Sequence, residues 1–199
     1  MRALLVLLIA LPALPLFAAD FEAGVRHVVA MPMGESGDLD IPLSRGFAAT
    51  GEVFFTPRIS AQLSATFVNP EAILYPSTPP PEDVDLGTLG LDVYSATARL
   101  HFRSEHRFSP FVGAGGALVM LGNLDDQFGG DVEAEFDDEL TFVVEGGVRY
   151  RFRPSLFLEL SAAYLPLEAE TQVIRTNIAL PETVGIDPLI VSAGASWRF

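Results

Sequence analysis

Residues 58–69 read RISAQLSATFVN, and polar and apolar side chains alternate along them. Successive side chains of a β-strand point to opposite sides, so this segment would form a strand with two unlike faces. The apolar face would carry Ile59, Ala61, Leu63, Ala65 and Phe67. The polar face would carry Arg58, Ser60, Gln62, Ser64 and Thr66. Residues 93–103 (VYSATARLHFR) and 141–152 (TFVVEGGVRYRF) repeat the pattern, which predicts a chain built from such strands.

A soluble β-sandwich also alternates, so strand length and spacing must separate it from a membrane barrel. The runs are about ten to fourteen residues long, near the length that a tilted membrane strand requires. We predict strands at 21–30, 46–56, 58–69, 90–103, 107–121, 140–152, 155–167 and 187–199.

Short and long connections alternate between these predicted strands. The short links lie around Pro57, at 104–106 and at 153–154, and the long ones at 31–45, 70–89, 122–139 and 168–186. Short periplasmic turns and long extracellular loops are typical of outer-membrane barrels. The sequence therefore predicts an all-β fold, an eight-stranded antiparallel transmembrane β-barrel with both termini in the periplasm.

Residues 1–19 differ in kind from the rest of the chain. A basic start at Arg2 is followed by an apolar run and by two small residues, which is the layout of a secretory signal peptide. We expect cleavage after Ala18 or Ala19, which leaves residues 20–199 as a barrel in the outer membrane of a Gram-negative bacterium. A retained N-terminal anchor is the alternative.

The predicted last strand ends on aromatic residues that share one face, Trp197 and Phe199. This end resembles the assembly signal of bacterial outer-membrane proteins, in which a final phenylalanine is read by the barrel-insertion machinery. Other aromatic residues gather near both predicted rims, as interfacial girdles do. The expected partners are therefore outer-membrane lipid, lipopolysaccharide and the insertion machinery.

Composition argues against several functions. The net charge of −14 disfavours nucleic-acid binding, and the absence of cysteine excludes disulfides and thiolate metal sites. By strand parity His27 faces lipid or the interface, His101 faces the lumen, and His106 lies in a turn; none has a partner at metal-ligand spacing. No serine lies in a nucleophile turn. We predict no enzyme activity, no cofactor and no metal, with a barrel-embedded protease or lipase as the weaker alternative.

Most of the 26 acidic residues fall in the long predicted loops, and residues 131–137 read DVEAEFD. Alternating carboxylates can ligate calcium, but the glycine and the spacing of an EF-hand loop are missing. A solvated loop is the favoured interpretation. The alternative is that divalent ions bridge these carboxylates to lipopolysaccharide phosphates.

Inward-facing residues separate by height in the predicted barrel. The lower set is charged and comprises Glu22, Arg26, Glu52, Arg99, Glu145, Arg149 and Glu159. Charges in a narrow, low-dielectric interior are tolerated only when paired, so we expect a salt-bridged plug there. The upper set is apolar and comprises Ala48, Val68, Leu118, Val143, Leu165 and Ile190, although the glycine-rich fifth strand leaves the parity of Leu118 open. This division predicts an apolar ligand pocket that is open above and blocked below; a fully packed interior is the alternative.

Two stretches resemble the outer-membrane protein W (OmpW) family of small barrels. Residues 107–115 (RFSPFVGAG) are similar to that family's proline-aromatic-valine-glycine strand start, and residues 186–199 (IDPLIVSAGASWRF) to its aspartate-proline entry into the last strand. The family often has an aromatic where Leu189 stands and asparagine-tyrosine where Gly116-Ala117 stands. The resemblance implies an eight-stranded barrel with a hydrophobic channel that passes small apolar molecules sideways into the membrane.

The leading hypothesis is passive uptake or binding of small hydrophobic molecules. Its predicted pocket residues are Ala48, Val68, Val143, Leu165 and Ile190, above a floor of Glu52, Arg99, Glu145, Arg149 and Glu159. A closed structural barrel that supports membrane integrity or presents acidic loops is the second hypothesis, and a narrow ion channel is the third.

Overall fold

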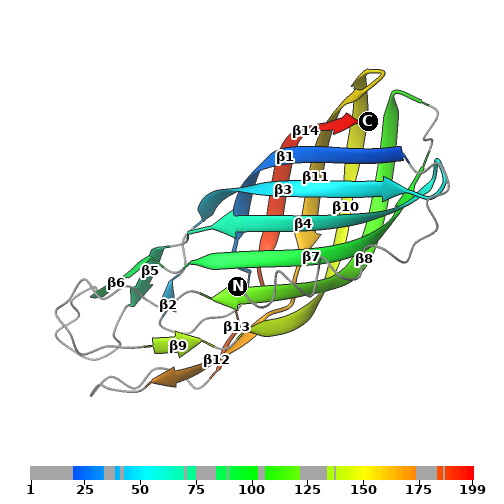
Figure 1. Ribbon diagram of the computed structural model, residues 1–199. Helices are drawn as coiled ribbons and strands as arrows, with labels where there is room; N and C mark the ends of the chain where they lie inside the picture. Colours follow the sequence, from blue (N-terminus) through cyan, green and yellow to red (C-terminus); the bar gives the residue numbers. More distant parts are fainter. Residues whose placement is uncertain are drawn as a thin grey trace.

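The protein closes into an eight-stranded antiparallel barrel (Figure 1). The computed structural model describes residues 20–33, 39–40, 43–69, 71–74, 84–88, 90–102, 106–121, 134–136, 138–173, 183–185 and 187–199. The barrel strands are β1 (Asp20–Met31), β3 (Ser44–Phe54), β4 (Ile59–Val68), β7 (Leu91–His101), β8 (Phe108–Leu121), β10 (Glu139–Arg153), β11 (Leu156–Tyr164) and β14 (Leu189–Arg198). Their neighbour order is β1-β14-β11-β10-β8-β7-β4-β3, and β3 pairs with β1 to complete the ring.

The predicted strand plan is confirmed. Every predicted strand corresponds to one barrel strand, and no predicted boundary differs from the observed one by more than three residues. The largest difference is at residues 165–167, which follow β11 but lie outside any strand. The predicted signal peptide, residues 1–19, lies outside the described residues.

The barrel exposes apolar side chains and buries charged ones. On the outer face Val25 is 69% exposed and Leu140 is 79% exposed, whereas inside the barrel Glu22 and Arg99 are almost fully buried. A soluble sandwich would show the opposite distribution, so the outer surface is built for an apolar medium. Within the described residues there is no helix of the length and apolarity needed to cross a membrane.

The glycine-rich strand β8 corrects one prediction. Ala117 and Val119 are the buried residues of its loop-end half, and Leu118 lies opposite the exposed Leu140, so the inward placement of Leu118 is wrong. Residues 113–117 are glycine and alanine, which give no contrast between polar and apolar faces. The small residues instead allow β8 to lie close to β7, because a Cβ on Gly115 would collide with a backbone oxygen of β7.

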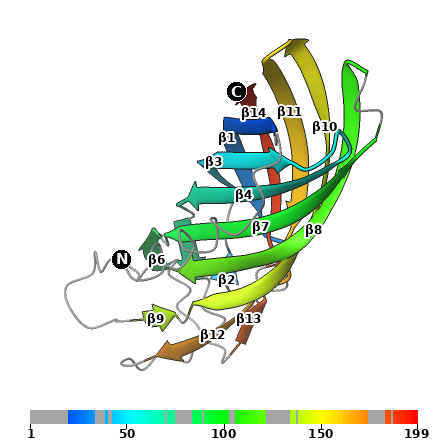
Figure 2. The same ribbon diagram turned by 45° about the vertical axis from the view of Figure 1, so that its right-hand side comes forward.

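The long connections contain short strands that the sequence did not predict. One three-stranded sheet is formed by β2 (Leu39–Asp40), β5 (Glu71–Leu74) and β6 (Val84–Thr88), and a second by β9 (Ala134–Phe136), β12 (Glu168–Val173) and β13 (Thr183–Gly185). Figure 2 shows both sheets at the end of the barrel away from the C-terminus. Backbone groups in long loops need hydrogen-bond partners, and these ladders supply them.

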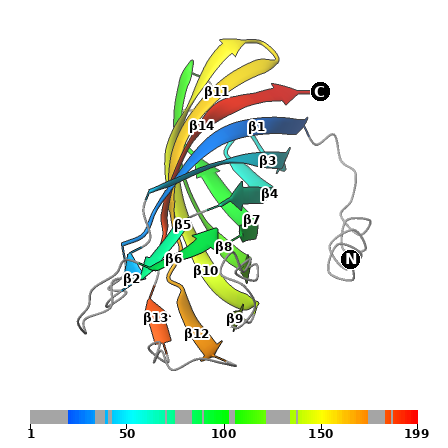
Figure 3. The ribbon, with the colours of Figure 1, turned by 90° about the vertical axis from the view of Figure 1, so that its left-hand side faces the viewer.

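The start of β1 and the end of β14 lie at the same end of the barrel as the short turns (Figure 3). The register of β1 and β14 pairs Glu22 with Arg198, and the backbone N–H of Phe199 donates to the carbonyl of Phe21 at 2.9 Å. Phe199 is 76% exposed, as expected for a side chain that faces outward. That this end faces the periplasm stays a prediction.

Candidate functional site

The five predicted pocket residues lie together at the loop end of the lumen. Ala48, Val68, Val143, Leu165 and Ile190 are each no more than 7% exposed and belong to one apolar cluster. Its other buried members are Val28, Ala30, Leu91, Val93, Ala117, Val119 and Leu167. We call this set the apolar cluster. Its role in ligand binding stays a prediction.

Two leucines of the apolar cluster come from a segment outside the strands. Leu165 and Leu167 follow the end of β11 and are almost completely buried. The N–H of Leu165 donates to the carbonyl of Pro188 at 3.2 Å, and that of Leu167 donates to Asp187 Oδ1 at 3.0 Å. Asp187 has a φ of 38°, a left-handed conformation that aspartate tolerates better than most residues. The entry into β14 therefore holds both leucines in the lumen.

A cavity of about 50 Å³ lies where the apolar cluster meets polar side chains. Val28, Ala48, Val143 and Leu165 line its apolar side. Its polar side includes Arg26, Gln62, Ser64, Thr66, Ser95, Thr97, Glu145, Ser161 and Ser192. This volume holds a few water molecules and is far below the roughly 300–1,000 Å³ of ordinary ligand pockets.

Arg99 is the centre of a charged layer beneath the apolar cluster. Its Nε and Nη2 donate to the two oxygens of Glu145 at 2.7 and 2.6 Å, a bidentate geometry. Its Nη1 lies 3.1 Å from Glu159 Oε1 and 3.6 Å from Glu52 Oε2. Arg26 Nη2 lies 2.8 Å from the same Glu159 oxygen. We call these residues, Arg26, Glu52, Arg99, Glu145 and Glu159, the Arg99 layer.

The sequence grouped Arg149 with these residues, but the structure places it in a second charged group. Arg149 donates to Glu22, which also accepts from Arg198 Nε at 2.7 Å and from the hydroxyl of Ser196 at 3.1 Å. This group lies at the turn end of the barrel, below the Arg99 layer. Arg198 was not among the predicted site residues, although it alternates with the outward Trp197 and Phe199 and so must face inward.

His101 contacts Ser60 and Glu52 of the Arg99 layer in a geometry that differs from that of a nucleophile triad. Its Nε2 lies 3.0 Å from Ser60 Oγ and 3.0 Å from Glu52 Oε1, and Ser60 itself donates to Glu52 at 2.5 Å. In a nucleophile triad the serine and the carboxylate contact different ring nitrogens, whereas here they share one. No group of three or more metal-ligating side chains occurs in the described part of the chain. The acidic stretch 131–137 lies largely outside the described residues.

A closed barrel with an apolar outer surface and ion pairs in its lumen is an outer-membrane β-barrel, a fold that leaves no sheet edge unpaired in lipid. The sequence model of the OmpW family matches residues 23–199, so this chain belongs to the OmpW family. The resemblance inferred from the residues at 107–115 and 186–199 is thereby confirmed.

Several solved structures share the fold. OprG, an outer membrane protein from Pseudomonas aeruginosa, matches with a TM-score of 0.78 at 14% identity, over 91% of this chain and 96% of that chain. The outer membrane protein AlkL, solved by solid-state NMR in DMPC bilayers, matches at 0.63 and 18% identity, over 91% and 90%. Outer Membrane Protein W of E. coli matches at 0.52 and 18% identity, over 89% and 97%. No curated protein sequence matches the chain.

Proposed function

We propose that this outer-membrane barrel binds small hydrophobic molecules in the loop-end part of its lumen and takes them up passively. The observation that carries the proposal is the division of the lumen into an apolar cluster at one end and charged groups below it. Because the ion pairs of Arg99 cross the lumen beneath the apolar cluster, an apolar molecule entering from the loop side meets a polar floor there. Membership of the OmpW family supports the same function. In this proposal the long connections face outward, and the short turns and both termini face the periplasm.

Binding requires the apolar cluster to open, since the cavity beside it is only about 50 Å³. Leu165 and Leu167 are the side chains best placed to move. They lie outside the strands, so their displacement breaks contacts with Asp187 and Pro188 and leaves the barrel ladder intact. The hydrophobic ligand would then occupy the space that these leucines fill in the closed protein.

The test is a titration of the refolded barrel in a neutral detergent with the apolar fluorophore N-phenyl-1-naphthylamine, corrected for empty micelles. We expect saturable binding that is lost in Leu165→Arg, because the buried charge and its hydration would fill the apolar cluster. Leu43→Arg is the matched control, since Leu43 is 55% exposed and outside the cluster. Unchanged binding in Leu165→Arg would refute the assigned pocket.

A closed structural barrel is the second candidate, and the packed apolar cluster is the observation that favours it. Wild-type protein that binds the fluorophore no better than empty micelles would make this the preferred function. The ion-channel hypothesis has less support, because Arg99 bridges carboxylates from three other strands across the lumen. Steady conductance that disappears when Arg149 is replaced would support a channel.

A further inference from the structure

A belt of polar side chains lies between the apolar cluster and the Arg99 layer. On β7, for example, the inward side chains run from Arg99 through two polar residues to Val93. The residues that line the cavity of about 50 Å³ from this belt are Gln62, Ser64, Thr66, Ser95, Thr97, Ser161 and Ser192. We call this set the polar belt. Several of its hydroxyl groups already have partners, since Ser161 bonds to Ser192 at 2.8 Å and Thr97 donates to a carboxylate of the Arg99 layer at 2.6 Å.

Gln62 is the largest member of the polar belt, and its amide has no partner. The side chain is 4% exposed, takes an inward position on β4 and lines the cavity. The register places it between Glu52 of β3 and Thr97 of β7, but both of these bond to other side chains. The Gln62 amide makes no hydrogen bond to any described residue, although it carries two donors and an acceptor. A buried amide in this state favours a guest that supplies the missing partner.

Ser95 offers a second hydrogen-bonding group to the same cavity. Its hydroxyl also makes no hydrogen bond to a described residue. Ser95 lies opposite Ser64 in the pairing of β4 with β7, so it is a diagonal neighbour of Gln62 on the inward face. Diagonal neighbours in a sheet are about 7–8 Å apart, which allows one small group to contact both.

The cavity limits the group that Gln62 could bind. About 50 Å³ accommodates a hydroxyl or a carbonyl group but not a sugar or a phosphate. A charged group of either sign would meet a like charge, because both Arg26 and Glu145 line the cavity. Their own counter-ions are already engaged, since Arg26 pairs with Glu159 at 2.8 Å and Glu145 with Arg99 at 2.6 Å. The group that fits is therefore small, polar and uncharged.

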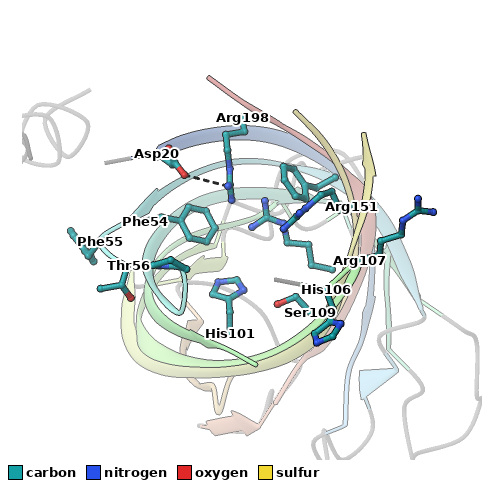
Figure 4. A pocket seen from close by; sticks show the side chains of 13 residues that line it. Asp20, Phe54, Phe55, Thr56, His101, His106, Arg107, Ser109, Arg151 and Arg198 are labelled. Carbon is teal, nitrogen blue, oxygen red and sulfur yellow. Dashed lines mark hydrogen bonds and ion pairs between the residues drawn. The ribbon is translucent and has the colours of Figure 1, made fainter. Parts of the chain in front are cut away.

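The larger cavity at the turn end does not compete for a ligand that enters from the loops. Its volume is about 560 Å³, but the Arg99 layer separates it from the apolar cluster. Figure 4 shows Arg198 in this cavity with its ion pair to Asp20. Glu22 also binds Arg198 and Arg149, so both of these guanidinium groups have partners. The polar belt is thus the first hydrogen-bonding surface beneath the apolar cluster.

We propose that the apolar cluster and the polar belt together bind an apolar molecule that carries one small uncharged hydrogen-bonding group, such as an alcohol, and that Gln62 selects for this group. The inference rests on the proposed function, because the apolar body would occupy the space that Leu165 fills. The hydroxyl would lie in the cavity, where it donates to the amide oxygen of Gln62 or accepts from its N–H. A hydrocarbon of the same size would leave this buried amide unpaired.

The experiment compares two compounds of nearly the same shape, 2-naphthylmethanol and 2-ethylnaphthalene, as competitors of N-phenyl-1-naphthylamine on the refolded mature barrel. Each affinity is divided by the compound's own partition into empty micelles, which removes the general preference of apolar media for the ethyl group. We expect the alcohol to have the higher relative affinity, by about threefold or more, as one or two buried hydrogen bonds would give. A smaller preference would overturn the proposal.

Gln62→Leu should reduce this preference to about twofold or less, because it removes the amide and keeps an apolar side chain of similar size. Thr50→Val is the matched control, since Thr50 is a buried polar residue of the lumen that does not line the cavity. It should keep the wild-type preference. A preference that persists in Gln62→Leu, or one that is lost equally in Thr50→Val, would refute the role of Gln62. A change that only weakens the fold would lower both affinities and leave their ratio unchanged.

Two further arms complete the test. The charged analogues 2-naphthoate and 2-naphthylmethylammonium should both compete more weakly than the alcohol, and tighter binding of either would exclude an uncharged group. If Gln62→Leu fails to refold, Ser95→Ala takes its place, and an unchanged preference in that variant would refute the site. Absence of saturable fluorophore binding to the wild type would refute the proposed function and this inference with it. Saturable binding without a preference for the alcohol would refute this inference alone.

Discussion

Replacing Arg99 with methionine tests whether the Arg99 layer holds the lumen together. The three carboxylates around Arg99 would be affected unequally. Glu159 keeps Arg26 at 2.8 Å, and Glu52 keeps His101 and Ser60, but Glu145 keeps only the hydroxyl of Thr97 at 2.6 Å. The substitution therefore leaves one buried carboxylate without a hydrogen-bonded cation, and only the longer-range attraction of Arg26 remains. Breaking a single buried pair in this way costs about 3–5 kcal/mol of the free energy of unfolding.

The double variant Arg99→Met/Glu145→Gln separates pairing from packing. Because the amide introduced at position 145 would carry no charge, the double variant should regain at least about 2 kcal/mol relative to Arg99→Met, a coupling within the range found for contacting residues. Arg26→Met should cost less, about 1.5–3 kcal/mol, because Glu159 still contacts Arg99. Urea unfolding in detergent micelles would be followed by the fluorescence of Trp197, the single tryptophan, which lies on the strand that closes the barrel. Arg99→Met within about 1 kcal/mol of the wild type, or a double variant no more stable than the single one, would refute the reasoning.

Three further substitutions test other parts of the structure. Gly147→Val should lower the free energy of unfolding by about 1–3 kcal/mol, because a Cβ at Gly147 would lie 2.5 Å from the backbone oxygen of Leu160 and 2.7 Å from the ring of Phe111. Urea unfolding equal to that of the wild type would contradict this. Phe199→Ala should reduce the amount of barrel assembled in cells, measured by the heat-dependent shift on electrophoresis, while refolding from urea stays nearly normal. Equal losses in cellular assembly and in refolding would indicate an effect on stability and not on recognition by the insertion machinery. Asp187→Gly keeps the left-handed backbone but removes the acceptor for the N–H of Leu167. It should therefore speed the association of N-phenyl-1-naphthylamine. An unchanged association rate in stopped-flow fluorescence would argue against movement of the segment that carries Leu165 and Leu167.

The strands could be predicted from the sequence because each barrel strand has one lipid face and one lumen face. Where the two faces of a strand do not differ in polarity, the sequence does not predict which side chains point into the lumen. Strand β8 has glycine or alanine at residues 113–117, and the orientation of Leu118 could not be read from them. The short strands of the loops were missed for a related reason: they pair with each other outside the membrane, where period two is not imposed by lipid.

The lumen residues could be assigned to a face but not to partners. The sequence placed Arg99, Glu145 and Arg149 inside the lower half of the barrel, yet it could not give the height of one strand relative to another closely enough to pair their side chains. That height depends on the register of every intervening pair, and the observed registers place Glu145 beside Arg99 and Arg149 beside Glu22. A shift of one residue would turn a strand's lumen side chains toward lipid, so the ion pairs depend on the register around the ring.

The charges of the Arg99 layer bear on the proposed uptake function. The Arg99 layer holds two arginines and three glutamates, a formal balance of −1. An apolar molecule that enters from the loops meets this layer beneath the apolar cluster and would have to desolvate its ion pairs to go further. The Arg99 layer therefore marks the lower end of the path open to an apolar ligand, and the proposed uptake must proceed sideways or end in binding above this layer.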